Sequence, residues 1–501
     1  MNLTKFKNLD KYTKLSITII IIGIIIRFYL ASVYHVSGDA CWQLSNSRFI
    51  AENHKIPLFE QFGRDEPFWA PPLFHIAAAF IYTAFRNFGN GAADFAVKML
   101  SPLLGSLTLI LSFQISRKLF NSKTAFYSSL FLAFIPLSID YSVFSYVDGM
   151  VAFMSVLSVY LALENRIFLC AMAAGFAILA KYNGIFILPV LVYITYLKNI
   201  KNRKNALKNI LIILAVSLAI GSVWFIRNWI YLGNPVWPLM NNVFHGLEIG
   251  TFAKTEIGEV NVSHIFSIDA ITTVYLEIFG VPNGDVNALF FFNLPYLNFL
   301  IPAWLLGTFV FLIPFLRGIK EHKELNYRGL IFIWIGSFLA LALLYILNAS
   351  WTVARFMLPA FPAVAMIWAH GLQKIKIKMR RIIIIMIAVV VIGFVLASFI
   401  KISLAAKAWD FYNEDFEWAR ANTNENEKFL TGSQCVSYNI GRQTVAPEAD
   451  NLEKADYVFA NQNFRLDRMA VLNPAIAKKL DENKKVYENK ETGTKIYKRT
   501  S

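Results

Sequence analysis

The sequence has few cysteines, few charged residues and no glycine-rich phosphate-binding motif. Three of its 501 residues are cysteine, which excludes a small scaffold held together by disulfide bonds. Charged residues make up 16% of the chain, whereas a typical soluble domain carries roughly 25%. The sequence contains no GxGxxG, Walker or C-x-x-C motif. Nucleotide-driven transport by this chain is therefore disfavoured.

Apolar residues are abundant and gathered in long runs. They form 56% of the chain, and the runs 15–34, 208–226, 328–347 and 382–400 are nearly free of charge. Each run is about long enough to cross a hydrocarbon core of ~30 Å. A soluble globular enzyme, a fibrous protein and a disordered protein are all excluded. The sequence predicts an integral membrane protein.

The net charge of +15 lies entirely in the apolar part of the chain. Residues 403–501 hold 15 basic and 15 acidic residues, so the whole excess belongs to the first 402 residues. Basic residues between apolar runs mark cytoplasmic loops. A nucleic-acid-binding protein would carry its excess on a soluble face, so we expect no nucleic-acid partner.

The basic clusters predict how the chain crosses the membrane. They lie at Arg117–Lys123, Lys198–Lys208, Arg317–Arg328 and Lys374–Arg381, with Arg166 marking one more short turn. The first run is long for a signal peptide and has no small-residue cleavage site, so we keep it as a span. If the basic loops are cytoplasmic, the segments between them cross in pairs. This gives eleven spans, at 15–34, 95–116, 124–142, 148–163, 167–181, 183–197, 208–226, 290–316, 328–347, 355–372 and 382–402.

This order of spans predicts a protein of the cell membrane with two domains. Residues 1–402 form an all-α polytopic bundle with a cytoplasmic N-terminus and two large outer loops, 35–94 and 227–289. The apolar stretch 71–85 is read as a helix in the outer interface or a re-entrant helix, because an additional span would put the basic loops outside. Residues 403–501 form a small extracytoplasmic α/β domain. Its strands are expected near 428–432, 456–460 and 494–498, and its helices at 410–421 and 474–482.

Four charged residues stand at the predicted outer ends of the spans. They are Asp39, Asp148, Lys181 and Arg355. Charges near hydrocarbon are rare and tend to mark function. A carboxylate can accept a proton from an acceptor, and cations can hold a phosphate leaving group. The simpler alternatives are a solvated loop aspartate and an arginine that reaches for lipid head-groups.

Metal and disulfide assignments follow less directly from the sequence. His75, His245 and His264 lack the spacing of metal ligands, so the sequence does not support a metal ion, although it leaves a divalent cation open, and it predicts no other cofactor. Cys41 and Cys435 both fall in predicted outer segments. They could form a disulfide or stay as free thiols.

An ordered set of short motifs resembles a known family. The motifs are Gly38-Asp39-Ala40, Glu66-Pro67-Phe68-Trp69, Ser145-Tyr146-Val147-Asp148, Leu179–Gly184 and Ala354–Pro359. Their order and spacing resemble the polytopic glycosyltransferases of the GT-C fold. The branch is that of the protein O-mannosyltransferases and the lipid A aminoarabinose transferase. The resemblance covers residues 15–200 and returns at 350–362.

The resemblance implies a reaction and a set of residue roles. Such enzymes move a sugar, with inversion, from a dolichyl or undecaprenyl phosphate to an acceptor on the outer face. Asp39 matches the catalytic base and Asp148 a second acidic position. The substrate-binding positions are expected at Lys181 and Arg355 near the lipid phosphate, at Glu66 near the acceptor, and at Arg48 and Tyr182.

The chain departs from the family in a few places. Ala40 and Ala70 stand where relatives often carry an acidic residue and a histidine. The Trp-Trp-Asp signature of oligosaccharyltransferases is absent, which disfavours transfer of a whole glycan to asparagine. The sugar is left open, and a protein, a lipid or a glycan would fit as acceptor.

Two other functions remain as alternatives. A transporter or flippase for a lipid-linked or anionic substrate would show inverted repeats and spans broken by glycine or proline, and neither is evident. A receptor whose tail binds a partner would leave the charges at the span ends unexplained.

Overall fold

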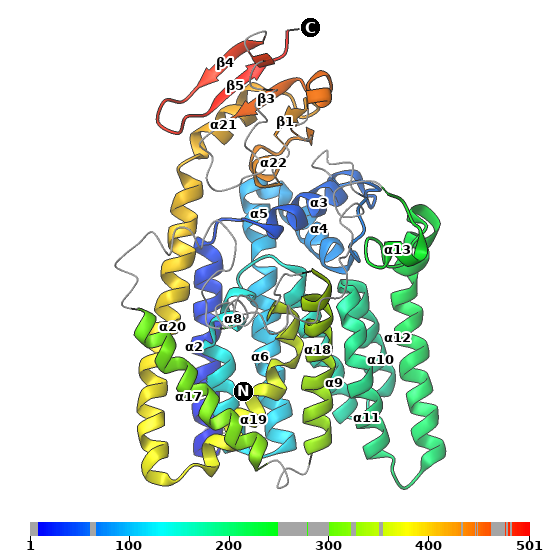
Figure 1. Cartoon of the computed structure of the whole chain (residues 1–501), viewed down its shortest axis with the longest axis vertical. Helices are drawn as coiled ribbons and strands as arrows, with labels where there is room; N and C mark the ends of the chain where they lie inside the picture. Colours follow the sequence, from blue (N-terminus) through cyan, green and yellow to red (C-terminus); the bar gives the residue numbers. More distant parts are fainter. Residues whose placement is uncertain are drawn as a thin grey trace.

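The computed structural model describes residues 9–60, 67–248, 300–321, 327–349, 354–431, 434–445, 449–461 and 483–500, with a few isolated positions between them. Glu66, most of loop 227–289 and most of the predicted helix 474–482 lie outside these residues. The described part is a bundle of long helices with a small sheet-containing domain at one end (Figure 1). We call this end of the bundle the domain end and the opposite end the loop end.

A helix stands at the position of every predicted span. Pro136 follows the end of α7, because the proline lacks a backbone N–H and excludes the helical conformation from the residue before it. The helices are α2 (Lys11–Val33), α6 (Leu100–Leu119), α7 (Ser122–Phe134) with α8 (Pro136–Asp140), α9 (Val147–Leu163), α10 (Ile167–Ala180), η2 (Tyr182–Ile187) with α11 (Leu188–Lys198), α12 (Arg203–Leu232), α17 (Leu300–Lys320), α18 (Arg328–Ala349), η6 (Ala354–Ala360) with α19 (Phe361–Lys374), and α20 (Ile377–Asp410).

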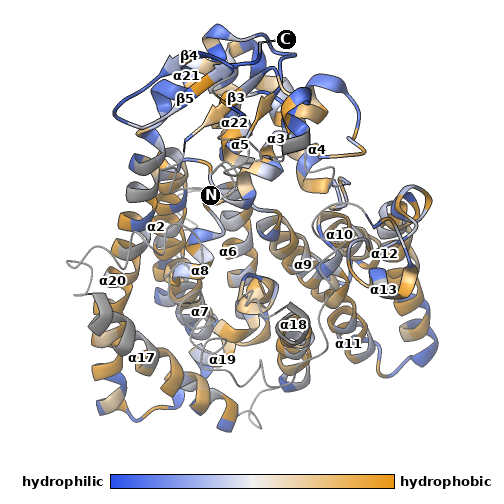
Figure 2. Ribbon diagram, turned by 45° about the horizontal axis from the view of Figure 1, so that its top comes forward, coloured by the Kyte–Doolittle hydropathy of each residue, from blue (hydrophilic) through white to orange (hydrophobic). Residues whose placement is uncertain are grey.

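The helices have the length and surface of membrane spans. Among the described residues, five helical segments are long and apolar enough to cross a bilayer, and four shorter apolar helices pack with them. Large apolar side chains cover the outer surface of the bundle, as on α12, where Val223, Ile226 and Ile230 are 64%, 56% and 68% exposed. Figure 2 shows this apolar belt between more polar ends. A multi-pass membrane protein is confirmed, and the number of eleven crossings stays a prediction.

Short helices cover the domain end of the bundle. They are α3 (Asp39–Asn53), α4 (Leu73–Phe85), η1 (Arg86–Phe88), α5 (Asn90–Lys98) and α13 (Asn241–Phe244). The apolar stretch 71–85 becomes α4, which packs against α3 and α5 beneath the small domain (Figure 1). With 13 residues, α4 is shorter than the ~20 residues that a crossing needs.

The small domain is built on a five-stranded mixed sheet. Its strand order is β2-β1-β3-β5-β4. Strand β1 pairs in parallel with β2 and β3, whereas β5 pairs antiparallel with β3 and β4. The elements are α21 (Asn413–Asn422), β1 (Phe429–Leu430), α22 (Gln434–Ile440), β2 (Thr444–Val445), η7 (Ala449–Lys454), β3 (Tyr457–Ala460), β4 (Lys484–Glu488) and β5 (Lys495–Lys498). Three strands match the predicted segments, and β2, β4 and α22 were not predicted.

The two parts of the chain are joined by a continuous helix and a shared core. Helix α20 runs past the boundary predicted at residue 402 and ends at Asp410. One apolar cluster contains buried residues of α3 and α4, such as Leu44 and Phe74, together with Phe416 and Val436 of the small domain. The small domain is therefore packed onto α3 and α4.

Candidate active site

Four of the predicted site residues come together at the domain end of the bundle. Asp39 is the first residue of α3, and Asp148 lies in the first turn of α9. Lys181 stands between α10 and η2, and Arg355 lies in η6. Gly38 has a φ of 60°, a conformation that is costly for residues with a side chain. Here it reverses the chain directly before Asp39.

Asp39 and Arg355 form the more exposed of two carboxylate–cation pairs. Arg355 Nη1 lies 2.8 Å from Asp39 Oδ2, and the two side chains are 22% and 53% exposed. The ring of Tyr146 lies beneath the guanidinium at 5.4 Å. The backbone N–H of Asp39 donates to the Tyr146 hydroxyl at 3.2 Å. Tyr146 therefore supports both members of the pair.

Lys181 and Asp148 form the buried pair. Lys181 Nζ lies 2.9 Å from Asp148 Oδ1, and the side chains are 15% and 6% exposed. The ring of Phe356 lies 4.4 Å from Lys181 Nζ and 5.9 Å from the Arg355 guanidinium. A buried carboxylate is stable as an anion only when it has a partner of this kind. Phe356 thus joins the two pairs into one cluster.

Arg48 lies away from this cluster and links two parts of the structure. Its Nη2 is 2.9 Å and 3.1 Å from the two carboxylate oxygens of Asp94. Its Nη1 donates to the carbonyl of Tyr438 at 3.3 Å, and the guanidinium is flanked by the rings of Tyr82 and Tyr438. These contacts connect α3 with α5 and with the small domain. Arg48 therefore helps to hold these parts together, and its role in substrate binding stays a prediction.

Tyr182 belongs to an aromatic cluster that fixes the first loop against α12. Its hydroxyl donates to the carbonyl of Trp69 at 3.0 Å and accepts from Asn228 at 2.7 Å. His75 is fully buried beside Trp42 and Phe68. Burial lowers the pKa of His75 to about 3, so the ring is neutral at neutral pH.

Two features of this region were missed by the sequence reasoning. Tyr146 and Phe356 stand next to the predicted residues in the sequence, and their aromatic type was the available signal. A second buried ion pair joins Asp140 at the end of α8 to Lys401 of α20, each 5% exposed. Lys401 Nζ lies 5.7 Å from the ring centre of Phe144, in the turn that leads to Tyr146. No pattern links positions so far apart in the chain.

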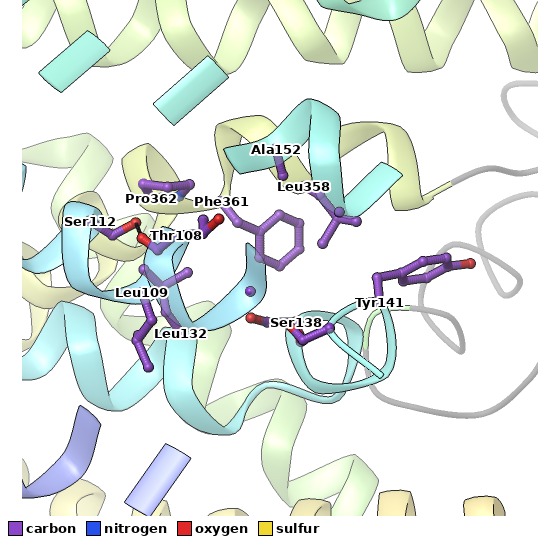
Figure 3. Close-up of a pocket in the computed structure, with 13 residues that line it drawn as sticks. Thr108, Leu109, Ser112, Leu132, Ser138, Tyr141, Ala152, Leu358, Phe361 and Pro362 are labelled. Atoms are coloured by element: carbon purple, nitrogen blue, oxygen red, sulfur yellow. Dashed lines mark hydrogen bonds between the residues drawn. The ribbon is translucent and has the colours of Figure 1, made fainter. Parts of the chain in front are cut away.

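A small cavity lies within the bundle between α6, α8, α9 and η6 (Figure 3). Its volume is about 40 Å³, and it adjoins the site because Gly149 and Leu358 are among the lining residues. The hydroxyl side chains of Thr108, Ser112 and Ser138 also line it. A water occupies about 30 Å³ in the liquid. The cavity thus has room for water.

The described residues include the types of side chain that form metal sites and disulfides. Within that part of the chain, no three His, Cys, Asp or Glu side chains gather as a metal site would require. Cys41 and Cys435 form a disulfide, which resolves the pairing that the sequence left open.

Comparison with known proteins identifies the fold. Residues 70–227 match the family model of dolichyl-phosphate-mannose-protein mannosyltransferases. ArnT from Cupriavidus metallidurans, in a structure bound to undecaprenyl phosphate, is similar with a TM-score of 0.59 and 14% identity, over 96% of this chain and 97% of that chain. No curated protein sequence matches.

An archaeal enzyme shows the same architecture. The oligosaccharyltransferase of Archaeoglobus fulgidus in its apo form is similar with a TM-score of 0.53 and 13% identity, over 97% of this chain and 74% of that chain. The same organism's AglB, in complex with an inhibitory peptide and a dolichol-phosphate, has a TM-score of 0.50 and 12% identity, over 97% and 74%. The chain therefore has the GT-C fold, as its motifs predicted.

Proposed function

We propose that the protein is an integral membrane glycosyltransferase that uses a polyprenyl-phosphate-linked sugar as its donor. The matching family model and the GT-C fold support this class. Two of the similar structures hold a polyprenyl phosphate, undecaprenyl phosphate in one and dolichol-phosphate in the other. A transporter or flippase is not favoured by these similarities.

The difference in exposure between the two ion pairs supports the roles that we assign to their residues. Asp39 is half exposed and Asp148 is nearly buried. An acceptor can therefore reach the carboxylate of Asp39, which acts as the general base. Asp148 holds Lys181 in place, and the two cations Lys181 and Arg355 receive the donor phosphate. The roles that the motifs assign to Glu66, near the acceptor, and to Tyr182, in substrate binding, stay predictions from the sequence.

The reaction follows from these positions. An acceptor hydroxyl oxygen attacks the anomeric carbon of the sugar from the face opposite the phosphate, and the new carbon–oxygen bond forms with inversion. The bond between that carbon and the phosphate oxygen breaks, and its electron pair leaves with the polyprenyl phosphate. Asp39 takes the proton of the hydroxyl. Arg355 and Lys181 stabilise the charge on the leaving phosphate.

The pairing of Asp39 with Arg355 suggests an order of events. The guanidinium of Arg355 contacts one oxygen of the Asp39 carboxylate. A bound phosphate offers Arg355 a stronger anionic partner, because the guanidinium matches phosphate in geometry. Donor binding therefore loosens Arg355 from Asp39 and readies the base for the acceptor.

The experiment for this function follows the donor. Purified protein in detergent is incubated with radiolabelled polyprenyl-phosphate sugars that differ in sugar and lipid, together with membrane extracts as a source of acceptor. We expect one donor to be consumed and its label to appear in a slower-migrating product. Movement of the intact donor across vesicles, without consumption, would instead support a flippase.

We further propose that the domain end faces outward and the loop end inward. The basic clusters lie at the loop end, and a disulfide joins α3 to the small domain, as is common in oxidising compartments. Asn202 and Lys490 are both exposed, at the loop end and in the small domain. In intact cells, an impermeant thiol reagent should label Lys490→Cys and leave Asn202→Cys unlabelled. Labelling of the second variant would reverse or refute this orientation.

A further inference from the structure

The segment that carries Asp39 is contacted at three points by one helix of the small domain. Cys41 forms a disulfide with Cys435 of α22. His35 Nε2 lies 3.2 Å from Asn439 Oδ1, also on α22. Arg48 Nη1 donates to the carbonyl of Tyr438, again on α22.

These contacts lie on both sides of Asp39, and the disulfide among them is buried. His35 precedes Asp39, whereas Cys41 and Arg48 follow it in α3. The side chains of both cysteines are at most 2% exposed. Cys435 Sγ also lies 3.9 Å from the carbonyl of Gly38, the residue directly before Asp39. Helix α22 thus fixes the chain on either side of the proposed base.

A second set of contacts joins the same segment to the end of α20. His35 Nδ1 lies 3.3 Å from Asp410 Oδ1. The imidazole also stacks on Trp409, with ring centres 5.7 Å apart and planes 8° from parallel. The link between α2 and α3 is therefore held between the last membrane helix and α22.

The position of Asp39 depends on how the start of α3 is held. Its side chain is 53% exposed, and residues 34–37 before it have no regular secondary structure. Arg355, its partner, belongs to the membrane bundle. The distance between the base and the phosphate-binding cations is therefore set by how α3 is held, and a misplacement of about 1 Å can cost roughly 10²-fold in rate.

We propose that α22 of the small domain is a positioning element for Asp39, acting through the Cys41–Cys435 disulfide and through Arg48. This inference rests on the proposed function for its effect on rate. The structural part of the proposal does not depend on any activity. It states that α22 holds the first turn of α3. The small domain is thereby part of the catalytic unit, although it supplies no group to the reaction.

The kinetic test compares three full-length enzymes. They are wild type, the double variant Cys41→Ser/Cys435→Ser, and Arg48→Gln. We expect kcat to fall on the order of tenfold in each variant, because the base is less well placed, while KM for the donor stays within about twofold because Lys181 and Arg355 are untouched. Arg48→Lys keeps the charge opposite Asp94 and should recover part of the rate.

Arg442→Gln is the matched control. The Arg442 guanidinium donates to the carbonyls of Arg420 and Thr423 within the small domain and has no hydrogen bond to α3 among the described contacts. Its loss should lower the stability of the small domain and leave kcat unchanged. If Arg442→Gln lowers kcat as much as Arg48→Gln does, the effect is general loosening of the domain and the proposal fails.

Amide hydrogen exchange tests the structural part without any substrate. In the cysteine variant, the amides of residues 36–44 should exchange at least about tenfold faster, while those of α9 and α10 keep their wild-type rates. Unchanged exchange in 36–44 would overturn the proposal even if the enzyme is active. Faster exchange in a protein that consumes no donor would refute the proposed function and leave the contact between α22 and α3 standing.

Discussion

The two carboxylate–cation pairs at the domain end are alike in composition and opposite in environment. Asp39 and Arg355 meet at the surface of the site, whereas Asp148 and Lys181 meet beneath it. The exposed carboxylate of Asp39 can exchange its partner for a substrate at little cost, because water already solvates it. A buried pair cannot, because each charge depends on the other. The exposed pair is therefore suited to chemistry and the buried pair to holding a cation in place.

Loss of the exposed carboxylate should have the largest effect. Asp39→Asn keeps the size of the side chain and removes its capacity to take a proton. We expect transfer to fall by about 10²–10⁴-fold, the usual contribution of a positioned general base, with normal expression and membrane insertion. Donor consumption followed by thin-layer chromatography measures this rate.

Glu321→Gln serves as the control for Asp39→Asn. Glu321 pairs with Arg317 near the loop end, also on the surface. Its substitution therefore removes an exposed ion pair that lies away from the site. Its rate should match wild type. A well-expressed Asp39→Asn enzyme within threefold of wild type would remove Asp39 as the base, and Glu66 would be the next candidate.

Loss of the exposed cation should be the next largest effect. Arg355→Ala removes one contact to the leaving phosphate, which is worth ~2–4 kcal/mol by analogy with oxyanion sites and corresponds to roughly 30- to 1000-fold in rate. The carboxylate of Asp39 remains, so the loss should be smaller than in Asp39→Asn. Single-turnover rates at saturating donor measure it, and Arg317→Gln is the matched control.

A near-normal rate in Arg355→Ala would mean that the guanidinium only restrains Asp39 in the resting protein. The single-turnover rate of Lys181→Ala, compared with wild type in the same way, then shows which cation binds the phosphate. Equal losses in the two variants would indicate that both cations contact it.

Breaking the buried pair should lower the stability of the protein, in addition to the rate that is lost with the phosphate contact of Lys181. Lys181→Met leaves Asp148 without its partner and should lower the free energy of unfolding by about 3–5 kcal/mol. The double variant Lys181→Met/Asp148→Leu should regain most of that loss, because no charge stays buried. At the exposed pair, Asp39→Asn should cost at most about 1 kcal/mol. Unfolding titrations in mixed micelles compare the four proteins, and equal losses at both pairs would remove the distinction between them.

The sequence predicted which residues form the site better than it predicted how they pair. Asp39, Asp148, Lys181 and Arg355 could be found because each is a charge beside an apolar run, and the parity of the spans placed them at one end. Which acid meets which cation depends on how the helices are rotated and tilted. For Asp39 and Arg355 this depends on packing between segments 316 residues apart, and periodicity within one helix does not record it.

Arg48 and the small domain show the same limit. Arg48 stands in the motif region and was predicted to bind substrate, yet the structure places it between Asp94 and Tyr438. The contact with Tyr438 exists only because α22 packs against α3. Strand β2 has two residues, too few for an alternating pattern, and α22 is seven residues long. Such short elements are stabilised by tertiary contacts and not by local sequence preference.

The disulfide has a consequence for how the protein is made. Its two cysteines are separated by 394 positions, so the second is synthesised long after the first. The bond can form only after Cys435 has left the ribosome and α22 has packed onto α3. Chains that terminate early therefore lack this crosslink. A cell that monitors unpaired thiols could thereby recognise an unfinished copy of the protein.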